Sequence, residues 1–254
     1  MATLARTSAV AQRLERNFFL GFALLGWSGV IMGFYPASSA RLAGKADYEA
    51  PLVLHIHAAS FVLWMVLLLA QVLLVRGDAR ARHRRLGLIA APLIPVMVLS
   101  GFFAEVYSQR FYLAHPPNSQ AFFIIPIFYV VAFGILATIA FARRTDPSAH
   151  KRLIYLATAV IAGAAWARWL GTAVTAVTGD GFAGMIANTF FATNMFLLAL
   201  LGLDLASRGR PHPVTVPAIL AVLAGELTVS WIYHSPAWLP IARAIVTPLP
   251  GPPF

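Results

Sequence analysis

The chain has 254 residues, of which 59% are hydrophobic and only 11% are charged, whereas a soluble domain carries about 25% charged residues. This composition excludes an ordinary soluble domain and indicates that lipid is the solvent for most of the chain. The formal net charge of +10 does not indicate nucleic-acid binding, because the basic residues stand in short connections between apolar runs. The sequence contains no cysteine, which excludes disulfides, thiolate catalysis, iron–sulfur clusters and cysteine-type zinc sites.

The predicted elements begin with a basic N-terminal segment, 1–17, which we expect to be a short interfacial helix. Seven apolar runs follow, each within the roughly 17–25 residues that a helix needs to cross a bilayer. They cover 18–35, 52–75, 86–104, 121–142, 153–177, 182–203 and 214–233. The tail 235–254 holds six prolines, and we expect it to be irregular and to lie on the outer surface. The sequence therefore predicts an all-α integral membrane bundle of about seven transmembrane helices over 18–234.

The distribution of lysine and arginine predicts the orientation of this bundle. Fourteen of these residues stand before the first run and in the connections after the second, fourth and sixth runs. Only four stand on the other side, namely Arg41, Lys45, Arg110 and Arg243. The positive-inside rule then places the N-terminus in the cytoplasm and the C-terminus outside, in the cell inner membrane.

The linkers after the second, fourth and sixth runs resemble one another. The first two read R-x6-H-[RK]-R-L, and their histidines, His83 and His150, stand 67 residues apart. A looser third copy contains His212. An acidic residue precedes each histidine: Asp78, Asp146 and Asp204. We infer one leading helix followed by three helical hairpins.

Two readings of these linkers remain open. In the first, the basic residues hold the loops at anionic headgroups, and the acids cap the next helix. In the second, the helix N-termini keep the three imidazoles neutral and available as ligands. His83, His150 and His212 with Asp146 would then hold a divalent metal, as in a metal-dependent membrane enzyme with an inner-face histidine site.

Four polar residues within the runs fall in one layer in the outer half of the bilayer: His57, Arg168, Asn188 and Glu226. At about 1.5 Å per residue they lie roughly 8 to 13 Å from the outer helix ends. An ionisable group at such depth normally faces the bundle interior with a partner, so Arg168 and Glu226 form the predicted pair. The layer is either a structural ion pair or an outward-open site for a small polar or anionic ligand.

Paired histidines also permit haem b, which needs two imidazoles at one depth on facing helices. One arrangement joins His83 with His150 on the inner side. The other joins His57 with His234, or with His115, on the outer side. A quinone is the other cofactor that a redox module of this kind would hold.

The first hairpin resembles that of an uncharacterised bacterial multi-pass membrane family, a domain of unknown function. The residues that carry the resemblance are His57, Gln71, Arg76 and the run His83-Arg-Arg-Leu-Gly87, and it extends over the second to fifth runs. The resemblance implies no established activity. It does imply that His57, His83, His150 and Arg168 are the positions to test first.

Three functions follow as hypotheses. The first is a membrane-embedded binding or redox module whose outer polar layer binds a small ligand, haem or quinone. The second is a non-catalytic accessory subunit or assembly factor, with other subunits of a membrane complex as partners. The third is the metal-dependent enzyme. All three have the lipid bilayer as a partner, and none has nucleic acid.

Overall fold

The computed structural model describes residues 2–46, 48–113, 115 and 120–249, the side chains of 2–8 excepted. These residues form helices and no strands: α1 (Ala2–Leu42), α2 (Leu52–Arg76), α3 (Arg80–Leu113), the short 3-10 helix η1 (Gln120–Phe123), α4 (Ile124–Ala142), α5 (Pro147–Thr178), α6 (Phe182–Arg208), α7 (Thr215–His234) and α8 (Trp238–Val246). Within this part of the chain, seven helical stretches are long and apolar enough to cross a membrane. The prediction of an all-α, multi-pass membrane bundle is therefore confirmed.

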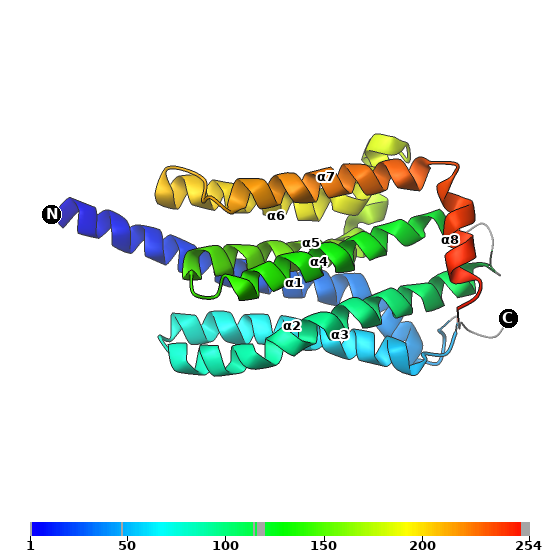
Figure 1. The fold of residues 1–254 in the computed structure, drawn as a ribbon, viewed down its shortest axis with the longest axis horizontal. Helices are drawn as coiled ribbons and strands as arrows, with labels where there is room; N and C mark the ends of the chain where they lie inside the picture. The colour runs from blue at the N-terminus through cyan, green and yellow to red at the C-terminus, as the bar shows by residue number, and fades with distance from the viewer. Residues whose placement is uncertain (1, 47, 114, 116–119, 250–254) are drawn as a thin grey trace.

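The helices are arranged as one leading helix and three hairpins. α2 packs on α3, α4 on α5 and α6 on α7, each pair joined by a short linker. In Figure 1, α6 and α7 lie along one side of the bundle and α2 and α3 along the opposite side. We call the end that holds the three linkers (77–79, 143–146 and 209–214) the linker end. The opposite end, which α8 crosses, is the α8 end.

Two segments outside the predicted spans differ from the prediction: the N-terminal helix is continuous with the first span, and part of the tail is helical. The N-terminal segment continues into the first span as part of α1, because 1–17 contains no glycine or proline to end a helix. The tail forms α8, whose Ala242 and Val246 are buried against Val106. Pro240 falls in the first turn of α8, where its missing N–H interrupts no helical hydrogen bond. Residues 250–254 of the tail lie outside the described residues.

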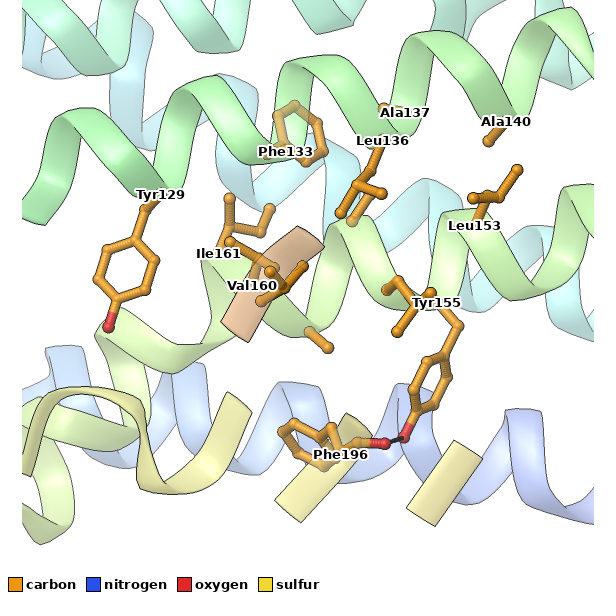
Figure 2. Close-up of a cluster of buried hydrophobic side chains, with 14 of the residues drawn as sticks. Tyr129, Phe133, Leu136, Ala137, Ala140, Leu153, Tyr155, Val160, Ile161 and Phe196 are labelled. Carbon is orange, nitrogen blue, oxygen red and sulfur yellow. Dashed lines mark hydrogen bonds between the residues drawn. The ribbon is translucent and has the colours of Figure 1, made fainter. Parts of the chain in front are cut away.

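α5 is the most buried of the spanning helices. Its small residues, among them Ala157, Ala159 and Gly163, allow neighbouring helices to approach closely. Figure 2 shows the aromatic and aliphatic side chains of α4 that pack on α5, and Tyr155 of α5, whose hydroxyl donates a hydrogen bond of 2.8 Å to the Phe196 carbonyl oxygen of α6. α5 thereby connects the hairpins into one core.

α1 packs on the same helix through glycine. A Cβ atom at Gly33 would collide with the Ala165 carbonyl oxygen, and one at Gly29 with the Trp166 indole. The two backbones approach too closely for any larger residue, as at small-residue contacts between membrane helices.

Candidate functional site

Arg168 lies on α5 with its side chain exposed at the bundle surface. Its guanidinium donates a hydrogen bond of 2.9 Å to the Ala164 carbonyl oxygen of the same helix. The guanidinium carbon lies 4.9 Å from the centre of the Phe34 ring of α1. The predicted ion pair with Glu226 does not form, and Arg168 has no carboxylate partner among the described residues.

His57 on α2 interacts electrostatically with Arg168. Its ring centre lies 4.2 Å from that of Phe61, and its Nδ1 atom is buried with no hydrogen-bond partner. Gly101 of α3 lies beside this imidazole, since a Cβ atom there would be 3.7 Å from Nδ1. Of the four residues predicted to form the layer, His57 and Arg168 therefore lie close enough to interact electrostatically.

Glu105 joins this neighbourhood and was not among the predicted site residues. It lies on α3, accepts a hydrogen bond of 2.7 Å from the Gln109 side chain, and interacts electrostatically with Arg168. The predicted third span ended at 104, whereas α3 continues to Leu113. The i, i+4 spacing of Glu105 and Gln109 is the sequence signal for that continuation. We call Arg168, His57 and Glu105 the Arg168 group.

Asn188 lies elsewhere, at the contact of α6 with α5. Its side-chain amide donates to the Gly171 carbonyl oxygen at 3.2 Å and to the Thr175 hydroxyl. It also lines an open groove of about 530 Å³ together with Ala167, Gly171, Thr172, Thr175 and Ala176. Asn188 therefore links α5 and α6 beside this groove. Ala167, the chain neighbour of Arg168, also lines the groove.

Glu226 on α7 is only 2% exposed. Its Oε2 atom accepts a hydrogen bond of 3.0 Å from the Asn194 side-chain amide of α6. The other oxygen of each group, Oε1 of Glu226 and Oδ1 of Asn194, is buried without a partner. Asn194 was not predicted, although an amide within an apolar span is a signal of the same kind as Asn188.

At the linker end, Arg152 is fully buried between carboxylates from two helices. Its Nε atom lies 2.7 Å from Oδ1 of Asp204 on α6, and Nη2 lies 2.9 Å from Oε1 of Glu15 on α1. Asp204 also accepts hydrogen bonds of 2.8 Å from the His212 backbone and 2.6 Å from the Thr215 hydroxyl. This set of contacts is the Arg152–Asp204 network, which ties α1, α5, α6 and α7 together.

The acids that precede the three linker histidines have different roles. Asp146 caps α5, accepting from the backbone N–H groups of Ser148 at 3.0 Å and Ala149 at 3.1 Å, and these bonds hold the pKa of its carboxyl below the usual range. The capping reading is thus confirmed for Asp146. Asp78 adopts a turn with a φ of 54°, and Asp204 belongs to the buried network.

The predicted inner-face metal site is not assembled. Within the part of the chain that the structure describes, no three histidine, aspartate or glutamate side chains gather as metal ligands. Asp146 is engaged in its cap, and the Nδ1 atom of His150 lies 2.8 Å from the Ala140 carbonyl oxygen. Burial, with the charges of Arg152 and Arg208, lowers the pKa of His212, which favours its neutral form.

The two histidine pairs proposed as haem ligands differ in how close their members lie. His83 and His150 interact electrostatically, so the inner pair is brought into proximity. His57 and His234 lie on α2 and α7, on opposite sides of the bundle in Figure 1, and Nδ1 of His234 lies 2.8 Å from the Ser230 carbonyl oxygen. In the described part of the bundle, the open groove beside Asn188 and the one beside Tyr107 are lined by no histidine.

Of the motif residues of the first hairpin, Gln71, Arg76 and His83–Gly87 lie at the linker end, whereas His57 lies near the opposite end of α2. A Cβ atom at Gly87 would lie 3.5 Å from the Gln71 side-chain nitrogen, and Gln71 interacts with His83. Arg76 donates to the Arg16 carbonyl oxygen at 2.7 Å, so the hairpin also holds α1. Comparison of the chain with protein-family models, curated proteins and solved structures finds no match, and the family resemblance of this motif stays a prediction.

Proposed function

We propose that this multi-pass membrane protein binds a small ligand through carbonyl or anionic oxygens at the Arg168 group, and that the ligand is a quinone. The observation that carries the proposal is the guanidinium of Arg168, which lies within a spanning helix without a carboxylate partner. A cation at such a depth is costly unless a group accepts its hydrogen bonds. The Ala164 carbonyl oxygen accepts one of these hydrogen bonds, and a ligand oxygen would supply a further acceptor.

The surroundings of Arg168 support a flat ligand. The Phe34 ring lies under the guanidinium, and the Trp166 and Trp169 rings pack with their centres 5.0 Å apart. The Nε1 atom of Trp166 and the Nδ1 atom of His57 are both buried without partners. Aromatic faces with a few convergent polar groups are typical of sites for ring-shaped ligands. The exposed side chain of Arg168 allows entry from the lipid.

The test is a binding titration in phosphatidylcholine nanodiscs. A short-chain quinone is added, and quenching of tryptophan emission is followed. Arg168→Leu removes a charge-assisted hydrogen bond, so we expect binding to weaken about 10- to 100-fold. The control is Arg144→Leu, which alters an exposed arginine whose side chain donates to the Phe141 carbonyl oxygen of its own turn and should leave the titration unchanged.

Equal affinity of native protein and Arg168→Leu would refute the proposal. A lipid phosphate is a second source of acceptor oxygens for the same guanidinium. If phosphatidylglycerol nanodiscs change the emission through Arg168 while the quinone has no effect, a headgroup occupies the site and the quinone is rejected.

One observation favours the accessory-subunit hypothesis as a second candidate. The start of α1 projects past the other helices at the linker end (Figure 1). A helix that leaves the bundle in this way suits contact with another subunit. Deleting residues 2–8 should then shift the protein from a larger to a smaller species on native gels of solubilised membranes, with quinone binding unchanged.

A further inference from the structure

Glu226 lies in the contact of α7 with α6 and does not belong to the Arg168 group. The side chain is 2% exposed, and among the described residues its carboxyl accepts one hydrogen bond, from Asn194 at 3.0 Å. No described lysine, arginine or histidine lies within ion-pair distance of it. An ionised carboxylate with one amide donor and no cation would be strongly disfavoured in this environment.

The two oxygens that lack partners suggest how the site is completed. Oε1 of Glu226 and Oδ1 of Asn194 are both acceptors, both buried and both without a donor, in two groups already joined through Nδ2 and Oε2. What the pair lacks is therefore a donor. A proton on the carboxyl turns it from an acceptor-only group into a donor and acceptor.

We propose that Glu226 and Asn194 form a proton-binding site between α6 and α7, in which the protonated carboxyl and the amide hydrogen-bond to each other as donor and acceptor. The proton adds to the carboxylate, and no bond other than O–H forms or breaks. A carboxyl that can take up and release a proton inside a membrane bundle is a relay element. This site does not depend on what binds at Arg168.

The groups that face the site are few. On α4, Tyr129 interacts electrostatically with Glu226 and with Arg168 of α5, and its hydroxyl donates to the Thr189 carbonyl oxygen at 2.7 Å. On α7 itself, the Ser230 hydroxyl donates to the Glu226 backbone oxygen at 2.6 Å, and His234 lies two turns further on. On α6, the nearest charged residue along the helix is Asp204, which is engaged with Arg152.

The experiment is an infrared pH titration of the full chain in nanodiscs. At neutral pH we expect the C=O stretch of a buried, protonated carboxyl, which is lost on alkaline titration and shifts in deuterated water. Glu226→Gln should abolish this band. Because glutamine supplies the donor for Asn194 without a proton, the variant should fold and melt at the native temperature. The control, Glu49→Gln at an exposed acid, should keep the band.

Two results would show that Glu226 is not the proton-binding group proposed. One is a native spectrum at neutral pH without a band that depends on Glu226. The other is stabilisation of the native protein by sodium chloride but not by choline chloride, absent in Glu226→Gln, because a sodium ion would then be the species that the two oxygens bind. Asn194→Leu distinguishes a pair from a lone acid: a proton shared with the amide predicts a shifted band, and an unshifted band rejects the pairing.

Discussion

At Arg152 a guanidinium lies fully buried between the carboxylates of Glu15 and Asp204. Serine and threonine hydroxyls complete its surroundings: Ser148 accepts from Arg152 at 2.9 Å, and Thr215 donates to Asp204 at 2.6 Å. Most hydrogen-bonding capacity of both charged groups is thereby used, which is the condition under which a buried ion pair is tolerated. The network stabilises the linker end through groups from four helices.

Breaking this network by one partner should be costly. Arg152→Leu leaves Asp204 buried without its counter-ion, and we expect a loss of about 3–5 kcal/mol in the free energy of unfolding. Reversible denaturation in mixed micelles measures it. Arg143→Leu, an exposed arginine of the adjacent linker, should change stability by less than about 0.5 kcal/mol. The double variant with Asp204→Leu should lose less than the sum of the single variants, and simple additivity would contradict the coupling.

Among the helices, the contact of α1 with α5 depends on backbone proximity more than on side chains. Gly33 lies against the Ala165 carbonyl oxygen, where no Cβ atom fits. Without a strong hydrophobic drive between helices in lipid, such close packing supplies much of the association energy. The same contact sets where Phe34 and Trp166 lie beside Arg168.

Gly33→Ala should therefore destabilise the bundle by about 1–3 kcal/mol through overpacking. α1 provides its own control, since a Cβ atom at Gly21 would meet nothing within 4 Å. Gly21→Ala should be neutral or stabilising by about 0.5–1 kcal/mol, because alanine is the better helix former. Both variants are compared by thermal unfolding in one detergent. Equal melting temperatures would show that the close contact at Gly33 does not contribute to the stability of the bundle.

For the whole molecule, the seven spans require the three linkers to lie on one face of the membrane. The charge asymmetry predicts that this face is cytoplasmic. The chain has no cysteine, so single cysteines can report the topology directly.

Arg82→Cys and Thr145→Cys should react with a membrane-impermeant thiol reagent in inside-out vesicles only, and Ala43→Cys in right-side-out vesicles only. Arg82, Thr145 and Ala43 are all exposed, so failure to react cannot come from burial. Labelling of Arg82→Cys and Thr145→Cys from opposite faces would show that the number of spans between them is wrong.

The sequence by itself determined the helix class, the seven spans and the three hairpins, because span length, apolar composition and linker charge are local properties. Only the tertiary structure decided which polar groups meet. Depth along a helix follows from residue number, so His57, Arg168, Asn188 and Glu226 could be placed in one layer, but the direction in which each side chain points depends on how the helices pack. Because of these directions, Arg168 does not contact Glu226, and Glu226 instead accepts a hydrogen bond from Asn194. Arg152, which stands in a basic linker, is for the same reason buried at the centre of an ion-pair network.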